Sequence, residues 1–219
     1  GILVFLNYLY FSKHLHILLA FPNTYFADLN AKGKLNNLES VTNEVKLMMD
    51  PSADPFAAPA NPEAVPAKFG ASDVQDLNWV QLLNAYSCTE CGRCTSSCPA
   101  NQTGKKLSPR KIMMDTRDRL EEVGRNIDLN KGVFVDDGKS LLNDYITPEE
   151  LWACTTCNAC VEECPINISP LSIIIEMRRY LVMEQSAAPM ELNNMMSNIE
   201  NNGAPWPYNQ MDRLNWVNE

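Results

Sequence analysis

The spacing of eight cysteines constrains this chain more than any other feature of its sequence. One segment reads CTECGRCTSSCP over residues 88–99, and a second reads CTTCNACVEECP over residues 154–165. Both segments space their cysteines identically, both end in proline, and together they contain every cysteine of the chain. The run C-x2-C-x2-C-x3-C-P binds a [4Fe–4S] cluster in bacterial two-cluster ferredoxins. The sequence therefore predicts a protein that holds two one-electron carriers.

The chemistry of a cubane explains this spacing. Each of its four iron corners takes one thiolate. Three closely spaced cysteines wrap three corners, and the fourth, followed by proline, ligates the other cluster in two-cluster proteins. We therefore predict crossed ligation, which would hold the two clusters close enough for electrons to pass between them. Site 1 is predicted to consist of Cys88, Cys91, Cys94 and Cys164, and site 2 of Cys154, Cys157, Cys160 and Cys98.

Zinc and disulfides are the alternative uses of these cysteines. Structural zinc sites usually combine two C-x2-C pairs across a longer gap, which differs from three cysteines in succession at this spacing. Disulfides suit small secreted domains, whereas this chain has 219 residues. We also expect no signal peptide, because neither a basic start nor an A-x-A cleavage site flanks the apolar run near residue 1. The repeated motif favours iron–sulfur clusters over both alternatives.

Composition narrows the classes of function. The formal net charge is −9 and the pI is near 4.8, which argues against nucleic-acid binding, since that requires a basic surface. Thiolates that hold iron indicate a reducing compartment, and the cluster region contains no histidine, which excludes a Rieske centre there. The sequence contains no P-loop and no G-x-G-x-x-G, so we assign no catalytic residue to this chain.

Residues 1–26 are predicted to be the end of a membrane or membrane-proximal helix. The run from Ile2 to Phe11 is apolar except for Asn7, but ten residues are too few to span a bilayer, which needs roughly 20. Such a run, followed by Lys13, is typical of the cytoplasmic exit of a membrane helix. A helix that is buried or docked on a partner is one alternative, and a signal sequence is another.

Residues 27–71 are expected to contain one helix and a linker. Residues 35–50 space their apolar side chains as an amphipathic helix does. Prolines then recur among alanines, a composition that is typical of extended, semi-rigid linkers. These prolines are Pro51, Pro55, Pro59, Pro62 and Pro66.

Residues 72–201 are predicted to form an all-α domain that holds both clusters, and residues 202–219 a docking tail with tryptophan and proline. Start signals for helices are Ser or Thr at the N-cap with proline or an acid after it. We expect a capping box at Ser72 to open a helix to Tyr86, and Gly124 to stop a second helix. The predicted helices cover 72–86, 108–123, 147 to the second motif, 169–183 and 190–200, with a turn or short strand at 132–135.

With these residues laid out, the chain resembles the helical iron–sulfur subunit of the heterodisulfide reductase family, of the C type. The segments CTECGRCTSSCPA (88–100) and CTTCNACVEECPINI (154–168) carry the match, together with the tail from Asn202 to Trp206, Arg213 and Trp216. The segment NYLYFSKHLHILLAFPNTYF (7–26) is similar to the exit of the last membrane helix in relatives that fuse this ferredoxin to a cytochrome-b-like membrane domain.

The resemblance implies an electron-transfer subunit at the cytoplasmic face of the inner membrane. It would relay single electrons between a membrane cytochrome b or quinone and a cytoplasmic partner subunit that carries a cysteine-rich domain or a flavin. His14 or His16, of which we favour His16, would be an axial ligand of haem b, with the other ligands in an upstream membrane domain. Interfacial histidines without haem are the alternative to this role.

A second function remains open from the sequence. The chain has no Cys-Cys pair, so disulfide or substrate chemistry would belong to another chain. An iron–sulfur subunit that docks on a soluble flavin dehydrogenase, of the glycerol-3-phosphate or glycolate oxidase type, is therefore the alternative function. The tail residues Trp206, Arg213 and Trp216 would either dock on the partner or close the domain by packing.

Charges within the motifs suggest which cluster is easier to reduce. Arg93 would favour the reduced, more negative cluster at site 1. Glu162 and Glu163 would disfavour reduction at site 2 if they face the cluster. The motifs alone therefore indicate a higher potential at site 1, with solvated surface charges as the alternative interpretation.

Overall fold

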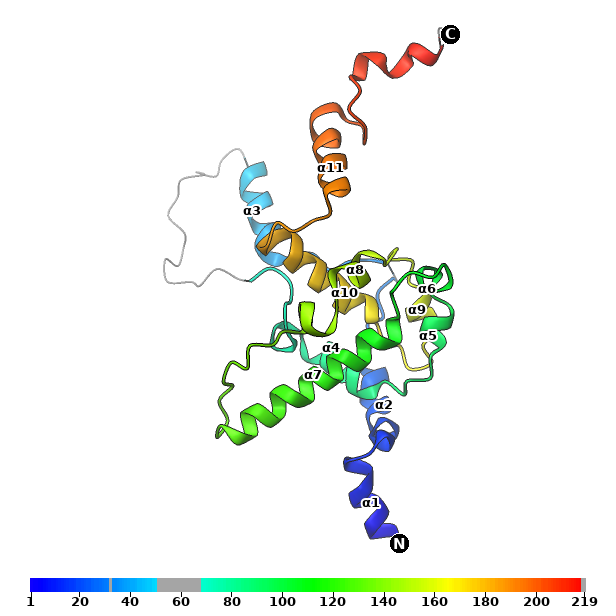
Figure 1. Ribbon diagram of the computed structural model, residues 1–219, viewed down its shortest axis with the longest axis vertical. Helices are drawn as coiled ribbons and strands as arrows, with labels where there is room; N and C mark the ends of the chain where they lie inside the picture. The colour runs from blue at the N-terminus through cyan, green and yellow to red at the C-terminus, as the bar shows by residue number, and fades with distance from the viewer. Residues whose placement is uncertain (32, 51–67, 218–219) are drawn as a thin grey trace. The chain divides into compact units, whose positions relative to one another are not determined.

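The structure is a computed structural model that describes residues 1–31, 33–50 and 68–217. The chain divides into two compact units, residues 1–180 and 181–219. Both are built from helices (Figure 1), and the described residues contain no strand apart from one isolated bridge between Leu142 and Ile146. The predicted all-α fold is confirmed. The domain boundaries proposed from the sequence stay predictions.

The N-terminal segment forms two helices separated by a turn instead of one continuous helix. Ser12 breaks the apolar run, because its hydroxyl accepts a hydrogen bond from the amide of His14 at 3.2 Å and so starts a new turn. His16 is the first residue of the helix that follows. The elements are α1 (Ile2–Tyr10), η1 (Lys13–Leu15) and α2 (His16–Tyr25).

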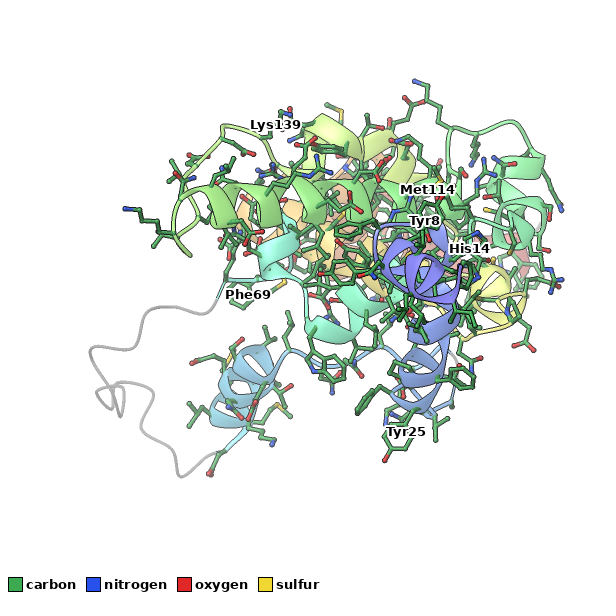
Figure 2. All side chains as sticks on the ribbon, turned by 90° about the horizontal axis from the view of Figure 1, so that it is seen from below. Tyr8, His14, Tyr25, Phe69, Met114 and Lys139 are labelled. Atoms are coloured by element: carbon green, nitrogen blue, oxygen red, sulfur yellow. The ribbon has the colours of Figure 1, made fainter. Side chains whose placement is uncertain are left out.

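Many apolar side chains of α1 and α2 are exposed. Tyr8 is 60% exposed and Tyr25 is 80% exposed (Figure 2). The others in these helices are Ile2, Leu3, Val4, Phe5, Leu6, Tyr10, Ile17, Leu18 and Phe21, and the C-cap residues Phe11 and Phe26 are exposed as well. Across the described ranges, no helix has both the length and the hydrophobicity that are needed to cross a bilayer. α2 is joined to the cluster region through Asn23, whose buried amide donates to the carbonyl of Ile166 at 2.8 Å.

The helix expected over residues 35–50 is present but shorter. It is α3 (Glu39–Met49), which Leu38 precedes in an extended conformation. The proline-rich linker predicted from Pro51 to Pro66 lies outside the described residues.

The helix predicted to open at Ser72 opens later. A capping box does form here, but between Asp73 and Asp76, because the Asp76 carboxylate accepts from the amides of both Ser72 and Asp73. This box closes only a single turn. A second box, between Asn78 and Gln81, opens the helix that leads into the first cysteine motif. The two elements are η2 (Val74–Asp76) and α4 (Trp79–Ser87).

The helix predicted to stop at Gly124 continues beyond it. This helix, α7 (Pro109–Leu129), begins as predicted, with the Ser108 hydroxyl accepting from the amide of Lys111 at 3.4 Å. Gly124 lies inside the helix because a central glycine costs only about 1 kcal/mol relative to alanine, which a long packed helix can offset. The predicted end was therefore wrong, while the predicted start is confirmed.

The remaining helix starts are confirmed. Thr147 forms a capping box with Glu150, and Ser169 caps the helix that follows the second motif. Residues 132–135 are not a strand. They form a loop that the side chain of Asn126 holds by two hydrogen bonds to Val135. The elements are η3 (Leu141–Tyr145), α8 (Pro148–Trp152), α10 (Pro170–Arg179) and η4 (Tyr180–Glu184).

The core of the first unit lies where α7 packs against α4 and α10. Its fully buried apolar side chains include Ile112, Met113, Leu151, Ile173, Ile174 and Met177. Because α4 leads into the first cysteine motif and α8 into the second, this packing fixes both motifs on one framework.

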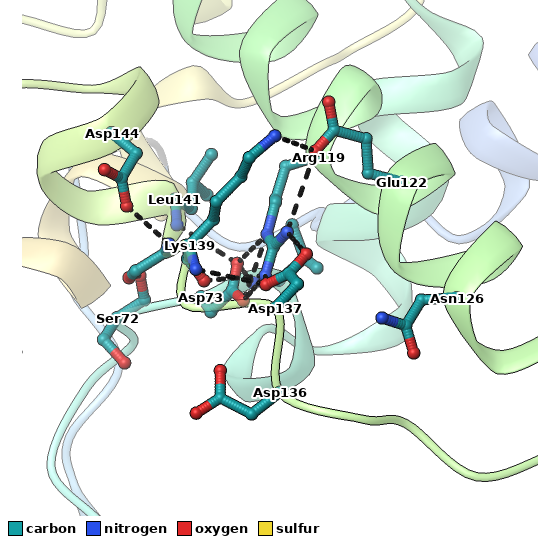
Figure 3. Close-up of polar contacts among 12 residues, drawn as sticks. Ser72, Asp73, Arg119, Glu122, Asn126, Asp136, Asp137, Lys139, Leu141 and Asp144 are labelled. Atoms are coloured by element: carbon teal, nitrogen blue, oxygen red, sulfur yellow. Dashed lines mark hydrogen bonds and ion pairs between the residues drawn. The ribbon is translucent and has the colours of Figure 1, made fainter. Parts of the chain in front are cut away.

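Arg119 of α7 is a fully buried cation within this framework. Its guanidinium donates to both carboxylate oxygens of Asp73 and of Asp137 and to the carbonyl of Lys139, over distances of 2.6 to 3.2 Å (Figure 3). The bonds from Arg119 lower the pKa of Asp137 to about 2. The network ties η2 and the loop before η3 to α7.

The second unit contains α11 (Met190–Asn202) and η5 (Gln210–Val217). Gly203 ends α11 in the left-handed conformation, with φ of 66°. Trp206 is 56% exposed and Trp216 is 72% exposed. The docking role of the tail stays a prediction.

We expect Gly70→Ala to lower the free energy of unfolding more than any other glycine substitution in the first unit. Gly70 has φ of +72°, and a Cβ there would overlap the carbonyl oxygen of Glu176 and lie 2.5 Å from the amide nitrogen of Tyr180. Backbone atoms cannot move aside cheaply, so the loss should reach about 3 kcal/mol, measured by urea denaturation under anaerobic conditions.

Gly104→Ala is the matched control. Gly104 has a similar φ of +79°, but a Cβ there would meet nothing within 4 Å. It should show only the backbone cost of about 1–2 kcal/mol. Equal losses in the two variants would contradict the close approach of Gly70 to α10.

Candidate iron–sulfur site

The two motif loops adopt the same backbone conformation. The residue two places after the first cysteine has a left-handed φ in each, 56° at Glu90 and 55° at Thr156. The residue four places after it is left-handed too, with 82° at Gly92 and 62° at Asn158. Such alternation turns successive amides toward one centre, an arrangement that occurs at many Fe–S sites. A short helix follows in each copy, α5 (Arg93–Ser96) and α9 (Ala159–Glu162).

Each loop borders a small cavity that also contains a cysteine of the other motif. Cys164 borders the cavity of the first motif, and Cys98 borders that of the second. The first cavity is lined by Cys88, Cys91, Cys94, Cys164 and also Cys160, and the second by Cys98, Cys154, Cys157 and Cys160. All predicted site cysteines are thus gathered in two adjoining groups, and the fourth cysteine of each motif lies with the other loop.

Backbone geometry carries the fourth cysteines away from their own loops. Cys98 is extended, with φ of −77° and ψ of 117°, and Pro99 begins the next helix, α6 (Pro99–Gln102). Proline disfavours a helical conformation in the residue before it, so the motif's final proline helps to set this direction. In the second copy, the amide of Ile168 donates to the sulfur of Cys164 at 3.3 Å.

The thiols are poor ligands until a metal is present. Burial raises the pKa of the Cys88, Cys94 and Cys154 thiols, and it raises the pKa of Cys160 to about 12. The neighbouring cysteines add to these pKa shifts, Cys164 at Cys88 and Cys98 at Cys154. A coordinated thiol is deprotonated outright, and the positive charge of bound iron would offset the repulsion between the thiolates. Among the residues that the structure describes, no group of three or more His, Cys, Asp or Glu side chains lies close enough together to hold a single metal ion.

The groups near the sulfurs suit a cluster that is held by thiolates. The amide of Thr156 donates to the sulfur of Cys154 at 3.4 Å. A hydrogen bond from the backbone of Glu90 acts to lower the pKa of Cys88, although burial, which raises this pKa, has the larger effect. Cys91 and Cys157, the second cysteines of the two motifs, are exposed, whereas Cys98 and Cys160 are buried. The residues therefore fit two four-thiolate groups, each with one edge near solvent.

Two arginines next to the cysteine groups were not predicted from the sequence. Arg117 of α7 pairs with Glu90 at 2.7 Å, beside Cys88. Arg178 of α10 donates to the carbonyls of Leu151 and Cys154. A sequence signal does exist: each arginine stands nine residues after the serine of a Ser-Pro helix start, Ser108 and Ser169. By contrast, Arg93, which was predicted to act on site 1, is exposed.

The histidines lie away from the cysteine groups in sequence, at the turn between α1 and α2. The rings of His14 and His16 have centroids 6.4 Å apart, with 35° between their planes. The role of His16 as a haem ligand stays a prediction.

Comparisons with known proteins identify this arrangement. Residues 87–168 match the 4Fe-4S dicluster domain. The probable iron-sulfur-binding oxidoreductase FadF of Bacillus subtilis is 32% identical over 246 aligned positions, which cover all of this chain and 32% of FadF. The EtfAB:quinone oxidoreductase of Syntrophomonas wolfei is 34% identical over 169 positions, which cover 69% of this chain and 24% of that protein. The chain thus spans about a third or less of the length of these relatives.

The C-type subunit of the ferredoxin/F(420)H(2)-dependent CoB-CoM heterodisulfide reductase of Methanosarcina acetivorans is 36% identical over 108 residues. That match covers 49% of this chain and 52% of the relative. It supports the resemblance that the motif segments first indicated. The matched domain, the eight gathered thiols and these relatives agree: this chain is an iron–sulfur protein with two [4Fe–4S] clusters, similar to the C-type subunit of heterodisulfide reductase.

Proposed function

We propose that this chain relays single electrons between a membrane cytochrome b or quinone and a cytoplasmic oxidoreductase subunit. The observation that carries the proposal is the gathering of eight thiols into two adjoining groups of crossed origin. Bound clusters supply one-electron chemistry. The chain supplies the ligands, the short separation and the amides that stabilise charge on sulfur.

We assign the ligands as the sequence predicted them. Site 1 takes Cys88, Cys91, Cys94 and Cys164, and site 2 takes Cys154, Cys157, Cys160 and Cys98. The crossed lining of the two cavities supports this assignment. The exposed cysteines Cys91 and Cys157 mark the edges through which electrons are exchanged with partners.

We propose that the N-terminal segment meets the membrane and that the clusters lie on the cytoplasmic side. Ile2, Leu3 and Val4 are each more than 70% exposed, and exposed apolar patches of this kind mark membrane or protein contacts. The name of the Syntrophomonas relative, a quinone oxidoreductase, supports a membrane electron carrier as the redox partner on this side. His16, at the start of α2, is the proposed haem b ligand, completed by an upstream membrane domain.

The partner on the other side is proposed to be an oxidoreductase subunit with a cysteine-rich domain or a flavin. The heterodisulfide reductase subunits among the relatives support the first type. Because the sequence contains no Cys-Cys pair, we assign the substrate chemistry to that partner.

A reduced-minus-oxidised visible spectrum of the full-length protein, extracted from membranes in detergent, tests this proposal. Sharp b-type haem bands above the broad cluster bleaching are expected. They should be lost in a His16→Leu variant and retained in the matched His14→Leu variant. Cluster bleaching without haem bands would remove His16 as a ligand and would favour docking on a soluble flavin dehydrogenase.

A further inference from the structure

Two equivalent arginines accompany the two cysteine groups. Arg117 follows Ser108 by nine residues in α7, and Arg178 follows Ser169 by nine residues in α10. Each reaches back to the loop of the motif that precedes its helix. The two sites therefore have equivalent arginines, and the charges around these arginines can be compared directly.

Arg178 brings a positive charge to site 2. Its guanidinium donates to the carbonyl of Cys154 at 2.5 Å and to that of Leu151 at 2.6 and 3.1 Å, and it lies 4.9 Å from the ring centre of Trp152. Burial lowers the pKa of Arg178, yet a guanidinium stays protonated in proteins. In the part of the chain that the structure describes, its bonds go to backbone carbonyls and it forms no ion pair with a carboxylate.

Arg117 at site 1 has a carboxylate to neutralise it. Its Nη2 lies 2.7 Å from Oε1 of Glu90, and both side chains are only 17% exposed. Glu90 is itself part of the motif, two residues after Cys88. The equivalent position of the second motif is Thr156, which carries no charge. The pair at site 1 is thus close to neutral, whereas the single arginine at site 2 is a net cation.

Other charges near the sites are exposed to water. Arg93 and Arg110 border the cavity of site 1, and both are exposed. Glu162 and Glu163 follow Cys160 and are exposed as well. Water and salt screen such charges far more than a partly buried guanidinium that is bonded to the ligand segment itself.

We propose that Arg178 makes the cluster of site 2 the easier one to reduce. Reduction adds one negative charge to a cluster, and an uncompensated cation next to it stabilises that charge. At site 1 the partly buried Arg117 is neutralised by Glu90, and the other arginines, Arg93 and Arg110, are exposed and screened by water. The proposal rests on the ligand assignment above, and it reverses the order that the exposed charges of the motifs indicate. Electrons that enter at site 1 would then collect at site 2.

An anaerobic redox titration of the full-length protein, followed by electron paramagnetic resonance, tests the order. Arg178→Met removes the cation at site 2 and should lower the upper of the two cluster midpoints. Glu90→Gln removes the partly buried partner of Arg117 at site 1, leaves it only the exposed carboxylate of Asp118 at 3.6 Å, and should raise the lower midpoint. Each variant should change one reduction equilibrium on the order of tenfold, which corresponds to about 59 mV for one electron. Both therefore narrow the gap between the midpoints.

The direction of the change decides the proposal without assigning either midpoint to a site. If site 1 had the higher potential, both variants would widen the gap. Unchanged midpoints in both variants would also overturn the proposal while leaving the electron relay intact. Clusters that assemble but cannot be reduced reversibly in the unmodified protein would instead contradict the relay itself.

Arg179→Met is the matched control. Arg179 is the next residue on α10, but it pairs with Glu176 at 2.6 Å. In the part of the chain that the structure describes, it forms no hydrogen bond with either cysteine motif. Both midpoints should stay in place in this variant. In Arg178→Lys the upper midpoint should stay close to that of the unmodified protein, because lysine keeps the positive charge. This variant separates the electrostatic role of Arg178 from a merely structural one.

Discussion

Replacing Cys164 by alanine is expected to remove the cluster of the first motif, although Cys164 belongs to the second. Cys164 borders the cavity lined by Cys88, Cys91 and Cys94. A cluster that lacks one of its four thiolate ligands is readily lost from the protein. The reduced variant should therefore show about one unpaired electron per chain, from the remaining cluster, instead of about two. Spin integration of the reduced protein by electron paramagnetic resonance measures this number.

Double variants show which cysteines share a cluster. If ligation is crossed, Cys88→Ala combined with Cys164→Ala damages a single cluster and leaves about one spin, as each single variant does. Cys88→Ala combined with Cys98→Ala damages both clusters and leaves about none. The opposite result for the two pairs would show that each motif supplies all ligands of its own cluster.

Replacing Arg119 by methionine should be the most destabilising change outside the cysteines. The substitution leaves Asp73 and Asp137 next to each other without the cation that bonds to both. Removing one partner of a buried ion pair costs about 3–5 kcal/mol, because the remaining charge is left uncompensated. Anaerobic urea denaturation, followed by circular dichroism and by cluster absorbance, should show a correspondingly lower midpoint.

Arg125→Met on the same helix is the control. Arg125 is 71% exposed and pairs with Glu121 at 3.0 Å, so its loss should cost at most about 0.5 kcal/mol.

The pH dependence of the free energy of unfolding adds a second check. Because the folded pKa of Asp137 is about 2, below that of the unfolded chain, its contribution is full above pH ~4 and is lost as the pH falls toward 2. Arg119→Met should lack this acid-dependent loss; an unchanged acid profile would contradict the network.

The starts of α7, α8 and α10 were predictable from the sequence, whereas the end of α7 was not. The Ser-Pro and Thr-Pro pairs at Ser108, Ser169 and Thr147 act on their own first turn, so a local pattern suffices. α7 continues beyond Gly124 to a turn where the Asn126 side chain bonds to Val135, nine residues further on, and the local pattern at Gly124 does not report that contact. The box predicted at Ser72 failed for a related reason, since Asp76 competes for the same amides.

The sequence by itself determined the cofactor, because thiolate number and spacing are properties of short segments, and it predicted the crossed pattern of the ligands. It also determined the helical class through those local starts. Only the tertiary structure decided the electrostatics of the two sites. Arg117 meets Glu90 across 27 residues, and Arg178 meets Cys154 across 24. Whether a charge is neutralised depends on which distant side chain folding brings within a few ångströms, and the sequence order does not contain that distance.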